Sequence, residues 1–300
     1  MNQQKKLVVL VGPTAVGKTA VALNVARYFN TAIVSADSRQ IFREMTIGTA
    51  KPTPAELSMV PHHFINTHSI HDSYDAAQYG RDALNCIHKL FESHDHLVLC
   101  GGSGLYIKAV CEGFDEIPEV PAEIREQLVT EFQTAGLGNL QQKLKQLDPE
   151  HFENIDTQNP QRVIRALEVI LGTGLSISSF HNNKKIKHDF HLVKIGLECT
   201  REVLYERINR RMDNMITEGL FDEAASLYAN KHMNALQTVG YQEIFDFMDG
   251  KYDREETIRL LKRNSRRYAK RQLTWFHRDG EIIWMDPAKI DDIIAMVSNN

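Results

Sequence analysis

Apolar residues in the first third of the chain fall in short continuous runs separated by stretches with helical spacing. The runs Leu7–Val11, Ala32–Ser35 and Leu97–Cys100 predict buried strands, and residues 20–29 and 75–92 predict helices. Strands that are apolar on both faces and alternate with helices are typical of a parallel sheet covered by helices on both sides. The pattern therefore predicts an α/β core, in which the loops after these strands meet at one edge of the sheet.

The pattern changes near residue 113. Residues 122–134, 137–146 and 160–171 have helical spacing without strand-like runs. A strand pattern resumes at His191–Leu197, and the remainder is mostly helical until Ile282–Trp284. We therefore expect a P-loop NTPase-like parallel sheet core, formed by residues 1–112 and 190–300, that is interrupted by a helical insertion domain of residues 113–189.

A glycine-rich octapeptide follows the first predicted strand. It consists of Gly12, Pro13, Thr14, Ala15, Val16, Gly17, Lys18 and Thr19, and it matches the pattern G-x-x-x-x-G-K-[ST] at every fixed position. In such a loop the backbone N–H groups and the start of the next helix bind an anion, the lysine adds positive charge, and the Thr19 hydroxyl can ligate Mg²⁺. The loop predicts a phosphorylated ligand, and nucleotide binding, including ATP, stays open at this point.

Composition limits the class of protein and its partners. The 300 residues are 42% hydrophobic and 25% charged, which is typical of a globular protein, and no apolar run is long enough to span a membrane. The four cysteines are scattered, which favours a reducing cytoplasm over a disulfide framework or a zinc site. The net charge is −4, yet residues 251–280 carry ten Lys/Arg against four Asp/Glu, which points to a polyanionic partner.

Basic residues and aromatic residues alternate in the predicted helix Leu261–Phe276. We expect its arginines to face RNA or a phosphate and its aromatic side chains to lie mostly in the core.

Asp37 directly follows the second strand, beside the glycine-rich loop. A carboxylate there could ligate Mg²⁺ or accept a proton, whereas the ordinary role of an Asp-Ser pair is to cap a helix. The third strand ends in Cys100, Gly101 and Gly102, without the metal-binding carboxylate that is usual in ATP hydrolases. This absence leaves small-molecule kinases and other transferases of phosphorylated ligands.

Two further groups of arginines are candidates for anion contact. Arg207 and Arg211 are four residues apart on an amphipathic helix and could clamp a phosphate, but spacing alone favours a solvated basic face. Gln161, Arg162 and Arg165 open a helix of the insertion, where they could contact phosphates or base edges.

Taken together, these segments resemble the tRNA dimethylallyltransferase (IPP transferase) family over nearly the whole chain. The matching segments are Gly12–Thr19, Ser35–Gln40, Ile47–Pro52, Pro61–His63, Gly101–Tyr106, Asn159–Glu168, Val239–Glu243 and Tyr268–Phe276. In two places the chain departs from the family pattern: Ser103 stands where threonine is common and Phe42 where tyrosine is frequent.

The resemblance implies a reaction and a set of roles. A dimethylallyl group would pass from dimethylallyl diphosphate to N6 of the adenosine 3′-adjacent to the anticodon in tRNAs that read codons beginning with U, and pyrophosphate would leave. Asp37 would be the general base, while Thr14 and Arg207 would stabilise the pyrophosphate with Lys18, Thr19 and Mg²⁺. Contacts with the anticodon stem-loop of tRNA are implied for Asp37, Ser38, Arg39, Gln40, Ser103, Arg125, Gln161, Arg162, Val163, Ile164, Arg165, Gln237, Thr238, Val239, Gly240, Tyr241 and Gln242. A monomeric cytoplasmic enzyme is expected.

Two alternatives belong to other classes. A small-molecule P-loop kinase shares the loop and the fold, but it predicts ATP turnover and needs no basic C-terminal helix. A non-catalytic RNA-binding protein predicts RNA affinity that does not depend on Asp37, although Lys18, Thr19, Asp37 and Arg207 are all present.

Overall fold

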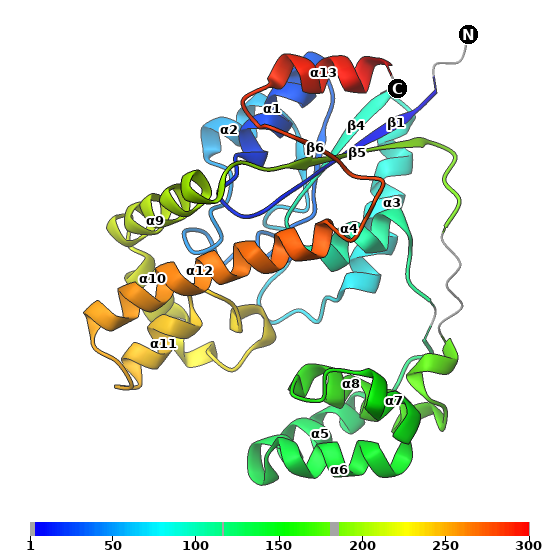
Figure 1. The fold of residues 1–300 in the computed structure, drawn as a ribbon, viewed down its shortest axis with the longest axis vertical. Coiled ribbons are helices and arrows are strands. Elements are labelled where there is room, and N and C mark those ends of the chain that lie inside the picture. Colours follow the sequence, from blue (N-terminus) through cyan, green and yellow to red (C-terminus); the bar gives the residue numbers. More distant parts are fainter. Residues whose placement is uncertain (1–3, 116, 181–185, 300) are drawn as a thin grey trace. The chain divides into compact units, whose positions relative to one another are not determined.

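A parallel sheet forms the centre of the larger part of the chain in the computed structural model, which describes residues 4–115, 117–180 and 186–299 (Figure 1). The order of its six strands is β3-β2-β4-β1-β5-β6, and every pair is parallel. The strands are β1 (Lys6–Val11), β2 (Ile33–Ser35), β3 (His62–His63), β4 (His96–Cys100), β5 (His191–Leu197) and β6 (Ile283–Met285). The predicted fold class is confirmed.

Helices connect and cover the strands. In the sheet-containing part they are α1 (Lys18–Tyr28), α2 (Pro54–Met59), α3 (Ala76–Phe91), α4 (Gly104–Cys111), α9 (Arg201–Thr217), α10 (Leu220–Leu227), α11 (Gln242–Met248), α12 (Arg254–Phe276) and α13 (Ile290–Asn299). Short 3₁₀ turns follow α10 at Tyr228–Asn230 and Asn234–Leu236.

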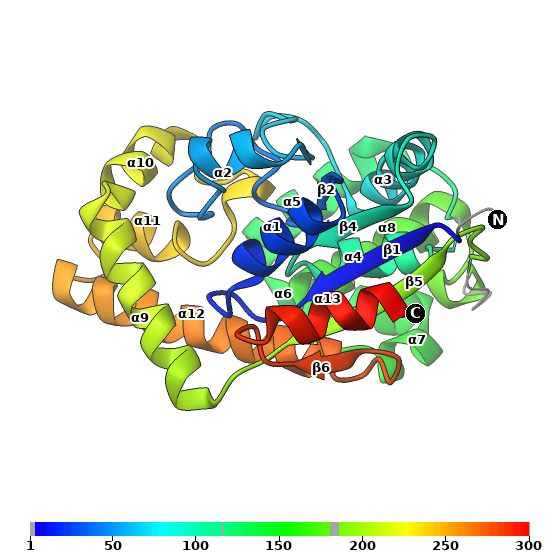
Figure 2. The same cartoon turned by 90° about the horizontal axis from the view of Figure 1, so that it is seen from above.

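The side chains of β1 alternate between two apolar clusters, one on each face of the sheet. Val8 and Leu10 pack with residues of α1, α9 and α13, and Figures 1 and 2 show α13 running beside α1. Leu7, Val9 and Val11 pack with α3 and α4 on the opposite face. Because both faces are covered, all six residues of β1 are buried, which is why the strand appears in the sequence as a continuous apolar run.

A third apolar cluster lies among the helices of the C-terminal part. It joins the last turns of α9 to α10, α11 and the first half of α12, with Met212, Leu220, Tyr241 and Leu261 among its buried members. This cluster fixes the helices that carry most of the basic residues of the chain's last third.

The chain divides into two compact units, Met1–Gly113 with Lys187–Asn300, and Phe114–Ile186. The second unit contains α5 (Ala122–Ala135), α6 (Leu137–Leu147), α7 (Pro149–Asn154), α8 (Pro160–Thr173) and a 3₁₀ turn at Ile177–Phe180. Its own core is built around Leu128, Leu140, Leu144 and Leu167. Within the described residues, no helix is both long and apolar enough to cross a membrane.

Sequence patterns located the long elements better than the short ones. The three predicted helices of the insertion match α5, α6 and α8 to within two residues at each end. The helix α4 directly after the glycine turn at residues 101–104, the short helix α2 and the two-residue strand β3 were missed. The basic helix begins at Arg254, seven residues before its predicted start, with Asp253 as its N-cap.

Candidate functional site

The glycine-rich loop connects β1 to α1 and packs at Gly12 against the end of β5. Gly12 has a φ of 147°, and a Cβ atom at this position would lie 2.6 Å from the backbone oxygen of Leu197, so only glycine fits. Gly17, with a φ of 112°, precedes the first residue of α1, which is Lys18. The loop therefore brings the N-terminus of α1 to the edge of the sheet, where its free N–H groups favour an anion.

Lys18 folds back over this loop. Its Nζ donates to the backbone oxygens of Gly12 and Pro13, at 2.9 and 2.8 Å. Burial lowers the pKa of Lys18 to about 8, although Cys100 and Asp37 act in the opposite direction. Lys18 forms no ion pair with the residues that the structure describes, although Asp37 is close enough to affect its pKa, so its ammonium group is available to an anion that enters the loop.

Two arginines of α9 face the same loop. Arg207 Nη1 donates to the backbone oxygen of Val16 at 3.0 Å, and Arg211 Nη1 lies 3.5 Å from the Thr14 hydroxyl. Burial lowers the pKa of Arg211, an effect that the nearby Asp37 opposes. The solvated basic face that spacing favoured is therefore wrong for these two residues, because the packing of α9 against the sheet turns them inward.

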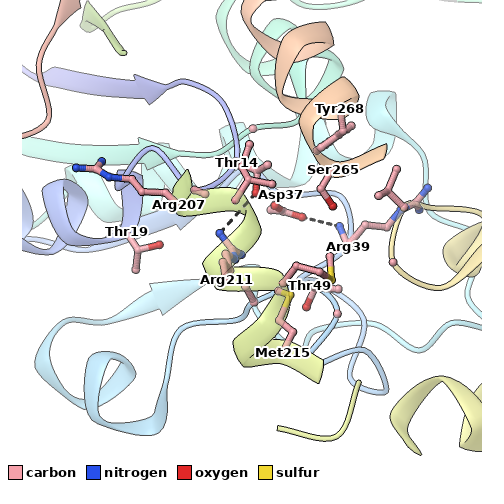
Figure 3. A pocket seen from close by; sticks show the side chains of 18 of the residues that line it. Thr14, Thr19, Asp37, Arg39, Thr49, Arg207, Arg211, Met215, Ser265 and Tyr268 are labelled. Carbon is pink, nitrogen blue, oxygen red and sulfur yellow. Dashed lines mark hydrogen bonds between the residues drawn. The ribbon is translucent and has the colours of Figure 1, made fainter. Parts of the chain in front are cut away.

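Asp37 caps a turn and also lines the pocket. Its Oδ1 accepts hydrogen bonds from the backbone N–H groups of Arg39 and Gln40, at 2.9 and 3.3 Å, so that it caps the turn after β2. The same side chain lines the pocket beside Thr14 (Figure 3). Capping thus holds the carboxylate at the edge of the sheet instead of diverting it from the pocket.

Ser103 supports the same turn from β4. Its hydroxyl accepts the N–H of Ser38 at 2.9 Å and donates to the Ser38 hydroxyl at 3.1 Å. Neither serine is part of the pocket wall. Their hydroxyls join the ends of β2 and β4, whose loops both approach the glycine-rich loop.

A cavity of about 650 Å³ lies over these loops (Figure 3). Of the residues predicted to be functional, its wall contains Thr14, Ala15, Gly17, Lys18, Thr19, Asp37, Arg39, Gln40, Arg207, Thr238, Val239 and Gly240. Residues 238–240 reach it from the segment before α11. The glycine-rich loop, a carboxylate and the apolar side chains of Met212 and Met215 thus share one pocket.

The ends of the segment 237–242 have other surroundings. Gln237 and Gln242 are exposed and hydrogen-bonded to each other at 2.7 Å. The Tyr241 ring is fully buried, and its hydroxyl donates to Glu223 at 2.6 Å. The Tyr241 side chain therefore cannot touch RNA, contrary to the expectation from the resemblance, because it fills the third apolar cluster.

Glu223 fixes a loop that the sequence alone does not assign to the site. Its carboxylate accepts the backbone N–H groups of Thr46, Ile47 and Gly48, at 2.8–2.9 Å. Gly48, Thr49 and Ala50 from this loop line the pocket. No spacing rule connects residue 223 to residues 46–48, so this contact becomes visible only in the folded chain.

The helix α12 contributes Ser265, Tyr268 and Gln272 to the pocket, none of which was predicted as a site residue. A signal in the sequence could have indicated two of them. The buried stripe of this helix includes Leu261, Ser265, Ala269, Gln272 and Phe276, and the polar Ser265 and Gln272 are unexpected in such a stripe. Of the aromatic residues, Phe276 is buried as predicted, whereas Trp275 is 36% exposed. Arg266 bonds to Asn209 at 2.6 Å and Arg267 is exposed.

The predicted tRNA-contacting residues of the helical unit fall into three groups. Arg125 and Arg165 form ion pairs with Glu168, and Gln161 accepts from Arg125 at 3.3 Å. Arg162 is exposed. Val163 and Ile164 are buried in the core of the unit, so their side chains are not available to RNA and the expectation is wrong for these two side chains.

Comparisons with known proteins point to one family. The model of the family described as IPP transferase matches residues 40–279. The chain is 51% identical to a tRNA dimethylallyltransferase of Cytophaga hutchinsonii, covering 98% of this chain and 96% of that protein. It is 48% identical to tRNA dimethylallyltransferase 1 of Bacteroides fragilis, covering 97% of each. A crystal structure of the full-length tRNA isopentenylpyrophosphate transferase from Bacillus halodurans matches with a TM-score of 0.73 and 40% identity, over 99% of this chain and 96% of that one.

Proposed function

The chain belongs to the IPP transferase family, and from this premise we propose that it transfers a dimethylallyl group from dimethylallyl diphosphate to a tRNA. The acceptor is N6 of the adenosine 3′-adjacent to the anticodon, in tRNAs that read codons beginning with U, and pyrophosphate is released. The observation that carries this proposal is the single pocket that joins the phosphate loop, two unpaired arginines and Asp37. A kinase is disfavoured, because the end of β4 offers no second carboxylate for γ-phosphate chemistry.

The phosphate end of the pocket is suited to the leaving group. Lys18, Arg207 and Arg211 present positive charge, and the Thr14 hydroxyl can donate a hydrogen bond. As the bond between C1 of the donor and the diphosphate oxygen breaks, the electron pair leaves with pyrophosphate. Donors that are already oriented at that position stabilise the developing charge without reorganisation.

Asp37 is positioned to accept the proton that N6 loses when it forms its bond to C1. Two backbone N–H groups hold Oδ1, so the orientation of the carboxylate is fixed before substrate binds. The acceptor base must leave its stack to reach the pocket, and the five-carbon group would lie against the largely buried side chains of Met212 and Met215 in the pocket wall.

Mg²⁺ fits this arrangement. Thr19 lines the pocket at the start of α1 and would hold the ion together with oxygens of the diphosphate. Within the described residues, no three His, Cys, Asp or Glu side chains gather into a metal site, so we propose that phosphates supply most of the ligands of the ion. When bound, the ion would neutralise part of the charge of the diphosphate.

The tRNA would be bound by polar residues that include the half-buried Arg39 of the pocket wall, the exposed Arg162 of the helical unit and the basic face of α12. We propose that the enzyme acts as a monomer. We place the activity in the cytoplasm, where tRNA is modified.

Replacement of Asp37 tests this proposal. Purified enzyme is incubated with dimethylallyl diphosphate, Mg²⁺ and unmodified tRNA, and the digested nucleosides are analysed by mass spectrometry. We expect Asp37→Asn to lower the transfer rate by about 10²- to 10⁴-fold, as for loss of a general base, with little change in tRNA affinity. The matched control is Asp75→Asn, which alters the N-cap of α3 at a residue outside the pocket wall. A near-normal rate for Asp37→Asn would remove it as the base.

An ATP-only reaction is run in parallel. Consumption of ATP with a small metabolite, and no prenylated adenosine, would favour the kinase over the transferase.

A further inference from the structure

We propose that Gln272 is a positioning residue for the transfer reaction: its carboxamide fixes the phosphate loop at Thr14 and ties it to the turn after β4. The proposal rests on the proposed function, because it assigns Gln272 a part in stabilising the leaving pyrophosphate. Gln272 comes from α12, more than 250 residues after the loop that it contacts.

Both ends of this side chain are used. Its Oε1 accepts the backbone N–H of Thr14 at 2.8 Å, and its Nε2 donates to the backbone oxygen of Gly102 at 2.9 Å. The residue is 7% exposed, so neither bond can easily be replaced by water. One acceptor and one donor on a planar group match one backbone N–H and one backbone carbonyl, and among the natural side chains of this length only glutamine supplies this pair.

The sequence leaves room for this contact. A Cβ atom at Gly102 would lie 2.3 Å from Gln272 Nε2, so a larger residue there would displace the carboxamide. The contact with Gln272 therefore requires a glycine at position 102, in the turn after β4.

Thr14 is the residue of the loop that most needs such support. Its N–H is bonded to Gln272, while its side chain lines the pocket within 3.5 Å of Arg211 Nη1. The remainder of the loop is fixed by Lys18, which bonds Gly12 and Pro13, and by Arg207, which bonds Val16. Without Gln272 the Thr14 peptide would be free to rotate, and its hydroxyl would lose the fixed direction toward the departing diphosphate.

Two substitutions of similar size separate a hydrogen-bonding role from mere packing. Gln272→Met keeps the apolar volume and loses both hydrogen bonds. Gln272→Glu keeps the shape, but only the protonated acid can accept from Thr14 and donate to Gly102 at the same time. The ionised carboxylate would set an oxygen against the Gly102 carbonyl.

The experiment measures kcat and KM for both substrates with the wild type and both variants, from pH 6 to pH 8.5. We expect Gln272→Met to lower kcat by about 10- to 100-fold, the scale of a misplaced reactive group, with KM for tRNA within about two-fold of the wild type. Because a glutamate is ordinarily ionised above pH 6 and Lys18 lies nearby, Gln272→Glu should show a comparable loss throughout this range.

The charged and titratable groups around Gln272 are Lys18, Cys100, Asp37, Arg211 and Tyr268. They are present in every variant, so each rate is divided by the wild-type rate at the same pH. The control is Gln141→Met, which removes a comparable side-chain bond to the Thr157 carbonyl from a residue outside the pocket wall. Melting temperatures are recorded for each protein.

Wild-type kcat in Gln272→Met, or in Gln272→Glu at any pH of the range, would overturn the proposal. A loss of activity that parallels the unfolded fraction would do the same. If the wild type itself forms no prenylated adenosine, the proposed function fails, and that result is distinct from a failure at Gln272.

Discussion

The helices α8 and α9 both carry arginines near one another in sequence, but the surroundings of these arginines differ. In the helical unit, Arg165 from α8 and Arg125 from α5 lie 3.2 and 3.0 Å from the Glu168 carboxylate, which is 10% exposed. In the sheet-containing unit, Arg207 and Arg211 of α9 donate to a backbone carbonyl and to a hydroxyl, and they form no ion pair with the described residues.

This difference separates arginines that stabilise a fold from arginines that are available to a ligand. A carboxylate neutralises the guanidinium that it binds, and little field remains for an external anion. Neutral acceptors orient a guanidinium and leave its charge uncompensated. On this basis we predict that the α9 arginines are available to a ligand, whereas the Glu168 cluster mainly holds α5 and α8 together.

The largest effect is expected where the charge is unpaired. Arg207→Gln and Arg211→Gln should each lower kcat/KM by about 100- to 1000-fold, as for loss of one donor to a developing anion, with little change in melting temperature. Steady-state kinetics and thermal unfolding measure both quantities. Arg201→Gln is the control on the same helix, because Arg201 is exposed, stacks on Tyr205 and is outside the pocket wall. A normal rate for Arg211→Gln would mean that an unpaired guanidinium here is not a ligand contact.

For the Glu168 cluster we expect a loss of stability, in contrast to the loss of rate expected for the α9 arginines. Glu168→Gln leaves two guanidiniums without their carboxylate and should lower the free energy of unfolding of the helical unit by about 1–3 kcal/mol. The expected loss is below that of a fully buried pair because both arginine side chains are 43% exposed. Urea denaturation of the full chain measures it.

Glu131→Gln is the matched control for the paired cluster. Its pair with Lys143 is more exposed and should contribute less than about 1 kcal/mol. Equal effects of Glu131→Gln and Glu168→Gln would show that partial burial adds nothing to the Glu168 cluster.

Local pattern was sufficient for the sheet and for the phosphate loop. The run Leu7–Val11, the fixed glycines and Lys18 follow one another in the chain, so periodicity and spacing describe them directly. The same holds for Asp37, which lies two residues after the end of β2. Ligand sites at strand ends are predictable because the topology of a parallel sheet brings those ends together.

Contacts between distant segments were not predictable in this way. Gln272 reaches Thr14, and Glu223 reaches Thr46–Gly48, only because α12 and α10 pack where the third apolar cluster places them. The same packing turns Arg211 to the pocket and buries Tyr241, whereas the separate core of the helical unit buries Val163. Spacing shows which side chains share one face of a helix. Whether that face is buried or exposed depends on how the helix packs in the whole fold.

The smallest effect separates two arginines of α8 itself. Arg162 is exposed and has no ion-pair partner among the described residues, whereas Arg165 pairs with Glu168 one turn later. If Arg162 contacts a tRNA phosphate, Arg162→Gln should weaken tRNA binding by a few-fold and reduce the slope of log K against log salt by about 0.7 to 0.9. Arg165→Gln should change the slope less, because its charge is already compensated. Filter-binding titrations between low and physiological salt measure both slopes. An equal reduction of the slope for Arg165→Gln and Arg162→Gln would mean that an arginine paired with Glu168 still contacts RNA. The distinction between paired and unpaired arginines would then fail in the helical unit.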